Sequence, residues 1–304
     1  MKRLKSRHGD TAVAERPVAA APDENAKLAA YVKSVRHLPP APQLIGELLP
    51  LFNQPDRDVD RIVKLLYHDP AMTAEVLKTC NNSAFSGGEK CTDMFEAVMR
   101  LGLYEVFRIV IAVSGSHMIS KSNAAAGLNV LKMWRHSVVC AVAASTIAAR
   151  VHQPEASAFT AGLLHDVGRL VFASAEGIEY SRLLARAGKD RLDVVELERT
   201  VYGFDHAEMG AHLLRRWHLP EGIVGGVRFH HHPADAGDHL ILAAVLHLAN
   251  VFSHSIDDFF ADPKVTLGNG TESSWLLRLR PAELPALLAA TRKGLDDAKD
   301  LLVL

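Results

Sequence analysis

Histidine and aspartate, the residue types that hold transition metals and activate water, recur in the second half of this chain. The segment "AGLLHDVGRL" sets a histidine beside an aspartate, and "HHHP" supplies consecutive histidines. Imidazole mixed with carboxylate suits Fe, Mn, Zn or Ni better than Ca or Mg. A bound ion of this kind lowers the pKa of coordinated water, especially when two ions lie close together. The candidate ligands are His136, His165, Asp166, His206, His230 and His231.

These candidates must come from separate helices if they are to meet. His136 falls in an Ala-rich helix predicted to begin near Leu128, and His206 opens another in "FDHAEMG". His165 and Asp166 lie inside the helical text "ASAFTAGLLHDVGRLVFASA". Adjacent residues on a helix diverge by about 100°, so this doublet cannot enclose an ion alone. Helical bundles build such sites from several facing helices, which is what we expect here.

The hydrophobic pattern predicts an all-α fold. Val59, Ile62, Val63 and Leu66 recur at helical spacing, and comparable stretches fill the rest of the chain from Lys27 onward. The run "RIVIAV" could be a buried strand by composition, but its helical flanks and the lack of a partner strand favour a helix. Alternating hydrophobic residues bounded by hairpin turns occur nowhere in the sequence.

The chain divides into four predicted parts. Residues 1–24 are rich in charge, Ala and Pro and are expected to be a disordered tail. Residues 25–127 form an N-terminal helical lobe, and 128–258 form the lobe that carries the candidate ligands. Residues 259–304 contain a connection and a last helix that begins near Pro281. That helix is expected to pack on the core, since its polar side is mixed in sign, through Leu284, Leu287, Leu288, Leu295 and Leu302.

Composition excludes several classes of protein. The formal net charge of −1 in 304 residues gives no basic bias toward nucleic acid. No apolar run approaches the ~18 residues of a membrane span, and no signal sequence opens the chain. Cys80, Cys91 and Cys140 show no CxxC spacing, which suits a reducing compartment. We therefore expect a cytoplasmic protein with no membrane and no nucleic acid as partner.

Several segments together resemble a known family. "HS" at His136, "GLLHDVGRL", "FDHAEMGAHLLRRWHLP" and "HHHP" resemble the HD superfamily of metal phosphohydrolases, with later histidines spaced as in its HD-GYP branch. "LPPAPQLIGELL", "HDPAMTAEVLKTCNNSAF" and "AVMRLG" narrow the resemblance to HDOD, the HD-related output domain of bacterial signalling proteins. The resemblance covers residues 31–255.

The resemblance implies a helical N-terminal lobe packed on a degenerate HD-like bundle. It implies a cytoplasmic bacterial signalling protein that acts on regulatory proteins, usually without demonstrated catalysis. It also implies one or two metal ions on the six candidate ligands. Two positions depart from the enzymes: Asn250 stands where a closing aspartate is expected, and Arg169 replaces a lysine. The GYP segment is absent.

Each feature also has a purely structural interpretation. His165 and Asp166 could be hydrogen-bonded core residues, His206 a helix-start residue, and His230 to His232 a solvated helix end. "NNSAF" could turn the chain or recognise a partner. Histidines outside these groups, including His247 and His254, are predicted to be surface or packing residues.

Three functional hypotheses therefore stay open. The first is an output or adaptor protein that acts by protein–protein interaction. The second is a metal-dependent phosphohydrolase of a nucleotide or cyclic dinucleotide, in which Asp166 would serve catalysis and Arg169 would help to bind phosphate. The third keeps the metal or a nucleotide as a structural or sensory ligand without turnover.

Overall fold

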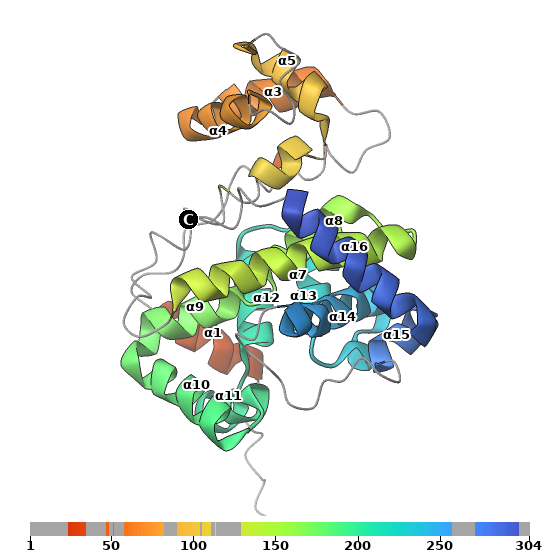
Figure 1. Ribbon diagram of the computed structural model, residues 1–304. Coiled ribbons are helices and arrows are strands. Elements are labelled where there is room, and N and C mark those ends of the chain that lie inside the picture. The colour runs from red at the N-terminus through yellow and green to blue at the C-terminus, as the bar shows by residue number, and fades with distance from the viewer. Residues whose placement is uncertain are drawn as a thin grey trace, which may run out of the picture.

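We describe the protein from a computed structural model. It places residues 24–34, 47–48, 51, 58–67, 69–81, 90–103, 105–110, 113, 129–256 and 271–297. Regular structure in these ranges is helical throughout (Figure 1), so the all-α prediction is confirmed. Residues 108–110, the start of "RIVIAV", are helical as expected. The tail before residue 24 lies outside the described residues.

Three helices of the first half pack on one another. They share a core that includes Ile62, Leu66, Met72 and Val76. The Asn81 side chain donates to the Leu77 carbonyl and exchanges two hydrogen bonds of 2.8 Å with the Cys91 backbone, which supports the turn interpretation of "NNSAF" for its first residue. Asn82 and Ser83 lie outside the described residues. The helices are α3 (Val59–Tyr67), α4 (Pro70–Cys80) and α5 (Met94–Leu101).

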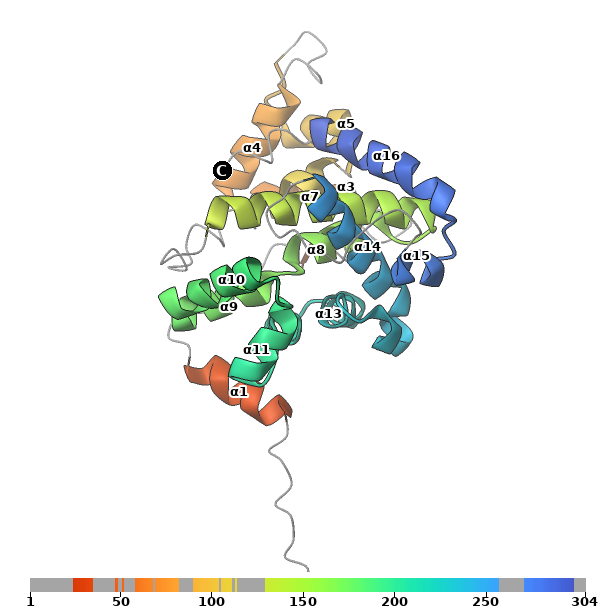
Figure 2. The same cartoon turned by 60° about the horizontal axis from the view of Figure 1, so that its bottom comes forward.

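The second half forms a larger bundle around one long helix, α7. Its neighbours include α8, α14 and α16 (Figures 1 and 2). Small residues permit the close approach: a Cβ on Gly162 of α8 would lie 2.8 Å from the Ala141 Cα of α7. The helices are α7 (Val130–Arg150), α8 (Glu155–Leu164), α9 (Val167–Glu176), α10 (Ile178–Asp190), α11 (Val194–Tyr202), α12 (His206–Arg216), α13 (Glu221–Arg228), α14 (Leu240–Ile256), α15 (Glu272–Leu276) and α16 (Leu284–Asp297), with the short helices η1 (Pro233–Asp235), η2 (Gly237–His239) and η5 (Pro281–Glu283).

Helix α1 (Glu24–Ser34) lies against this larger bundle, although the sequence groups it with the first half. The Tyr31 hydroxyl donates to Glu176 at 2.6 Å, and its ring packs edge-on against Phe172, Tyr202 and Phe204. Figure 2 shows α1 at the end of the molecule opposite α4 and α5, and in Figure 1 it likewise lies on the other side of α7 from α3–α5. The apolar side of α1 is thus covered by an aromatic cluster from the half of the chain that carries the candidate ligands.

The C-terminal helix packs on the core. Leu284, Leu287 and Leu295 of α16 are buried, and α16 contacts α7. Leu302 lies outside the described residues.

One described segment, residues 237–256, is long and apolar enough to cross a membrane, contrary to our expectation. Half of it is buried inside the molecule, and α14 packs against α7 and α13, so its apolarity is that of a core helix.

Candidate metal centre

The fold brings the six candidate ligands together. His136 comes from the second turn of α7, and His206 is the first residue of α12. His230 and His231 come after α13, separated from it by its C-cap Phe229. Their ligand atoms form two groups, each within 4.8 Å: His136, His165 and Asp166 in one, and His206, His230 and His231 in the other.

The doublet sits at a break between helices. The sequence analysis expected one helix through "GLLHDVGRL", but α8 ends at Leu164 and α9 begins at Val167. Asp166 has φ −97° and ψ 10°, which leaves the regular helix. The break lets His165 and Asp166 serve one centre: His165 Nε2 lies 3.6 Å from Asp166 Oδ1.

The first group joins α7 to this break. His136 Nε2 lies 3.2 Å from His165 Nε2 and 3.8 Å from Asp166 Oδ2. The other ring nitrogens meet oxygens: His165 Nδ1 lies 2.7 Å from the Gly162 carbonyl, and His136 Nδ1 lies 3.2 Å from the Ser253 hydroxyl.

The second group is held by α11, α12 and α13. Glu198 Oε2 accepts from the His206 backbone N–H at 2.7 Å and from Nδ1 at 2.6 Å. His230 Nδ1 donates to the Val227 carbonyl at 2.7 Å. His231 Nε2 lies 2.8 Å from His206 Nε2.

A capping box explains why α12 begins where it does. The Asp205 side chain accepts from the Glu208 backbone N–H, and the Glu208 side chain accepts from the Asp205 N–H. His206 therefore begins a helix, as the purely structural interpretation of this residue predicted. It is also fully buried and hydrogen-bonded within the centre. His230 is also fully buried, so the solvated helix end applies only to the exposed His232.

Asp166 joins the two groups. Its Oδ1 lies 3.2 Å from His206 Nε2, and its Oδ2 lies 3.0 Å from Arg169 Nε. Arg169, one turn along α9, is 6% exposed. A buried guanidinium thus occupies one side of the carboxylate that lies between the histidine groups.

Electrostatics keeps most of these imidazoles neutral. Burial lowers the pKa of His136, His165, His230 and His231. Burial would also lower the pKa of His206, but the Glu198 charge outweighs it and raises the pKa to about 9. Burial would raise the pKa of Asp166, but Arg169 and His165 hold it well below its usual value. Neutral imidazoles and an ionised carboxylate are the forms that bind metal.

The donor set fits a divalent metal ion. The Nδ1 atoms of His165, His206 and His230 each meet a carbonyl or carboxylate oxygen, so each ring can present Nε2 to an ion, His206 after losing the proton that its raised pKa keeps there. Metal-ligating histidines almost always show this arrangement. Within the part of the chain that the structure describes, the buried His230 Nε2 has no hydrogen-bond partner. A metal ion at this point would satisfy it.

Asn250 lies beside the centre and belongs to neither ligand group. Its carbonyl accepts from the Ser253 hydroxyl at 2.7 Å, and Ser253 in turn contacts His136. His254, one residue further along α14, has its ring 5.2 Å from the His136 ring. α14 therefore supports His136 through a serine and a histidine, and no carboxylate from it closes the centre.

Sequence reasoning missed Glu198 and Tyr180. Glu198 is fully buried, and its second oxygen accepts from the Tyr180 hydroxyl at 2.6 Å. A signal was present in the sequence. Glu198 stands three residues after Val195 on the apolar face of an amphipathic helix, where a carboxylate needs a partner to be buried.

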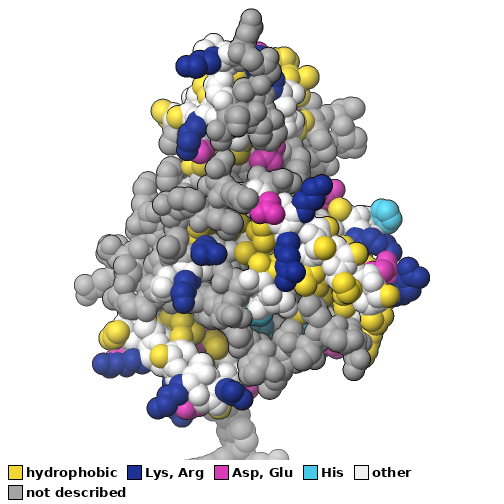
Figure 3. All heavy atoms as spheres, in the orientation of Figure 1, with side chains coloured by type: hydrophobic (Ala, Val, Ile, Leu, Met, Phe, Trp, Pro, Cys, Tyr) yellow, Lys and Arg dark blue, Asp and Glu magenta, His cyan; other side chains and the backbone are white. Residues whose placement is uncertain are grey.

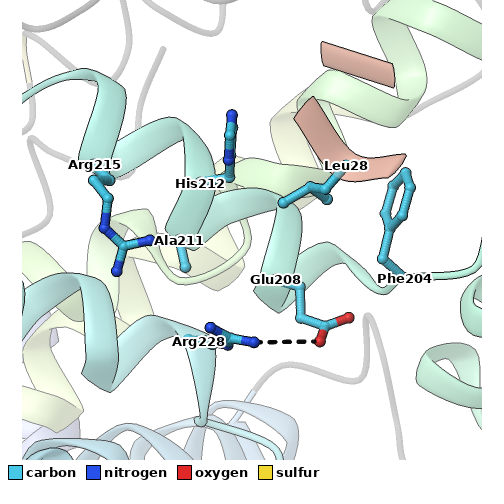
Figure 4. A pocket seen from close by; sticks show the side chains of 7 residues that line it. All are labelled: Leu28, Phe204, Glu208, Ala211, His212, Arg215 and Arg228. Atoms are coloured by element: carbon cyan, nitrogen blue, oxygen red, sulfur yellow. Dashed lines mark ion pairs between the residues drawn. The ribbon is translucent and has the colours of Figure 1, made fainter. Parts of the chain in front are cut away.

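A surface pocket lies between α1, α12 and α13, and none of the candidate ligands lines it (Figure 4). Arg228 and Glu208 face each other across it at 3.9 Å. Its lining residues are Leu28, Phe204, Glu208, Ala211, His212, Arg215 and Arg228.

Solved structures share this fold. An HDOD domain protein from Geobacter sulfurreducens aligns with a TM-score of 0.78 and 23% identity, over 92% of this chain and 98% of its own. A candidate phosphohydrolase from Shewanella amazonensis aligns with a TM-score of 0.68 and 26% identity, over 88% and 97%.

Curated relatives match part of their length. An uncharacterized protein of Treponema pallidum is 26% identical over 77% of this chain and 46% of its own length. Ribonuclease Y of Lactobacillus acidophilus is 26% identical over 58% of this chain and 26% of its own. The chain thus spans about half or less of these two relatives. The HDOD domain model matches residues 38–233, which is more than half of the chain and runs from α3 to η1. The chain therefore belongs to the HDOD domain family.

Proposed function

We propose that this chain is a regulatory output protein of bacterial, cytoplasmic signalling, which acts by binding partner proteins. Its histidine–aspartate centre would hold a divalent metal ion that braces the bundle without turning over a substrate. The observation that carries the proposal is burial. His136, His165, Asp166, His206 and His230 are each at most 2% exposed, and only His231 is partly accessible. A phosphate ester has to reach the metal to be hydrolysed.

The metal would be bound by imidazole nitrogens and Asp166, and when bound it would supply a Lewis acid. The chain's own residues do the rest. Glu198 and the Val227 carbonyl orient His206 and His230. Arg169 neutralises Asp166 from the opposite side. The ligands and the groups that orient them belong to or adjoin α9, α11, α12 and α13. A metal ion bound at this centre would therefore link four helices.

The first-half helices offer a surface for partners. Tyr67 of α3 and Phe95 and Met99 of α5 are 51%, 45% and 62% exposed. Figure 3 shows apolar side chains between charged ones on this part of the molecule. Exposed apolar residues rimmed by polar ones are typical of protein interaction sites.

The alternative is a metal-dependent phosphohydrolase of a nucleotide or cyclic dinucleotide. The retained donor set favours it, as do the names of two relatives, the Shewanella candidate phosphohydrolase and Ribonuclease Y. Arg169 argues against it. In an enzyme this residue would contact phosphate, whereas here it is buried against Asp166.

A turnover assay separates the two. Protein loaded with Mn²⁺, Fe²⁺ or Zn²⁺ is offered a cyclic dinucleotide and a chromogenic phosphodiester, beside a His206→Gln variant. We expect the same background rate from both proteins. Turnover on the order of 1 s⁻¹, a common enzymatic rate, that is lost in the variant would establish the phosphohydrolase instead.

A further inference from the structure

Helix α1 packs on a surface made of aromatic side chains. Phe172 comes from α9, Tyr202 from α11, and Phe204 from the connection between α11 and α12. The Phe172 ring stacks on Tyr202 with centroids 4.6 Å apart, and it lies nearly parallel to the Phe204 ring at 5.9 Å. We call these three residues, together with Glu176 of α9, the α1-binding surface.

α1 meets this surface with one face of an amphipathic helix. Leu28 and Val32 are 6% and 2% exposed, and Tyr31 is partly buried between them, whereas Lys27 and Lys33 are exposed. The Tyr31 ring lies edge-on to all three aromatic rings of the surface, and its hydroxyl donates to Glu176. Anchors at i, i+3 and i+4 are the pattern with which the helix of one protein docks into a groove of another.

α1 depends on this surface for its helical form. It has 11 residues, and isolated helices shorter than about 12–15 residues are marginal in water. The match to the HDOD domain model begins at residue 38, so α1 lies before it, whereas every residue of the α1-binding surface lies inside the match. The surface thus belongs to the family domain, and the helix that occupies it does not.

α1 leaves part of the site unfilled. The pocket beside Leu28 continues along α12 and α13, where Ala211, His212 and Arg228 line it (Figure 4). Well-packed contacts leave few spaces larger than a water molecule. The pocket is therefore room for side chains that α1 lacks and that another helix could supply.

The surface is unfavourable when it is empty. With α1 in place, Phe172 and Phe204 are at most 4% exposed. Exposure of such rings to water costs free energy in proportion to the apolar area. A molecule that releases α1 would therefore favour a second helix with the same kind of apolar face.

We propose that α1 is a displaceable occupant of a helix-binding site, and that the partner is an amphipathic helix with aliphatic, aromatic and aliphatic residues at the spacing of Leu28, Tyr31 and Val32. α1 competes with this helix, so the affinity for the partner is reduced by the fraction of molecules in which α1 is released. The inference rests on the proposed function, the binding of partner proteins, and adds a site and the chemistry of the partner.

A labelled peptide of residues 22–36 stands in for the partner helix, and fluorescence polarisation measures its binding to the full-length chain. We expect weak binding to the wild type. Binding to Leu28→Asp/Val32→Asp should be roughly tenfold tighter or more, because the chain's own helix no longer competes. Adding Tyr202→Ala, a change in the α1-binding surface, should remove this gain.

Lys27→Asp/Lys33→Asp is the matched control. It places the same two charges on the exposed side of α1 and should bind the peptide as the wild type does. Hydrogen exchange of the wild type needs no variant to fold. The α1 amides should exchange roughly tenfold faster than those of α12, because a docked helix of this kind opens as a separate unit, and excess peptide should accelerate α1 further.

Several results would overturn the inference. Absent or equal peptide binding in the wild type and Leu28→Asp/Val32→Asp would do so, as would α1 amides protected as strongly as those of α12. A wild-type dimer, seen by light scattering, that this variant converts to a monomer would assign the site to α1 of a second copy instead. Turnover of a phosphodiester would contradict the proposed function, and the peptide measurement does not depend on it.

Discussion

Gly168 of α9 lies directly against the backbone carbonyl of His206 on α12. A methyl group at this glycine would clash with that carbonyl oxygen and lie 2.7 Å from the Gly210 backbone nitrogen. The glycine follows the His165–Asp166 doublet by two residues, so the close approach of α9 and α12 is what brings Asp166 to 3.2 Å from His206. The "HDVG" segment thus contains two candidate ligands and the contact that positions them.

Gly168→Ala should force these helices apart. Both obstacles are backbone atoms, which cannot rotate away, so we expect a loss of about 1–3 kcal/mol in the free energy of unfolding, as overpacked cores show. Metal affinity should fall with it, because Asp166 and His206 separate. Urea unfolding and metal titration measure the two effects. Gly188→Ala on exposed α10, where a methyl meets nothing within 4 Å, is the control and should be neutral or stabilising.

Glu198→Gln should weaken metal binding by roughly 10- to 100-fold, as loss of an outer-shell partner does. The amide keeps the size of the side chain but removes the charge that raises the pKa of His206 to about 9. Competition with a chromophoric chelator gives the affinity, and ¹⁵N NMR of the histidines reports the His206 tautomer. Glu176→Gln is a matched control, since Glu176 also accepts from a tyrosine, Tyr31, away from the centre. Equal affinity in both variants would contradict a positioning role for Glu198.

The all-helical fold and the convergence of the candidate ligands follow from local patterns. Helical periodicity predicts α3, and four separated His/Asp motifs predict side chains on different helices. The contact of α1 with the far bundle could not be predicted, because an apolar helix face does not specify which aromatic cluster covers it. Tyr31 meets Phe172 and Phe204 only after α9 and α12 have folded together.

The pairing of side chains inside the centre could not be predicted from the sequence either. Spacing on the chain does not reveal that Arg169 faces Asp166, since the turn of α9 that aligns them begins only after the break at the doublet. Glu198 lies in a different helix from each residue that it orients. Its placement depends on the packing of α10, α11 and α12.

The three thiols should resist modification in the folded protein. Cys80, Cys91 and Cys140 are buried, and burial raises the pKa of Cys91 to about 11 and that of Cys140 well above its usual value. Because the thiolate is the reactive form, native protein should react with a thiol reagent at pH 8 only at the rate at which it opens. Labelling in 8 M urea gives the reference rate. A rapid burst of one equivalent in native buffer would contradict this prediction.

Metal-free protein should be most stable near pH 6.5 to 7. His136, His165, His230 and His231 have pKa values lowered by burial, so the unfolded chain binds more protons below 6.5, and stability is lost as the pH falls from there. His206 has its pKa raised to about 9, so its contribution is complete below 6.5 and is lost as the pH rises toward 9. Each group contributes at most about 1.4 kcal/mol per pH unit.

Four histidines act on the acid side and one on the alkaline side, so the acid limb should be the steeper. Urea midpoints at pH 5, 7 and 9 in the presence of a chelator measure both limbs. Saturating Zn²⁺ at pH 7 should raise the midpoint, because the ion binds only the folded chain, and this gain should shrink at pH 5, where protons compete for the same nitrogens. Equal midpoints at pH 5 and 7 in metal-free protein would show that these imidazoles are not held neutral by burial.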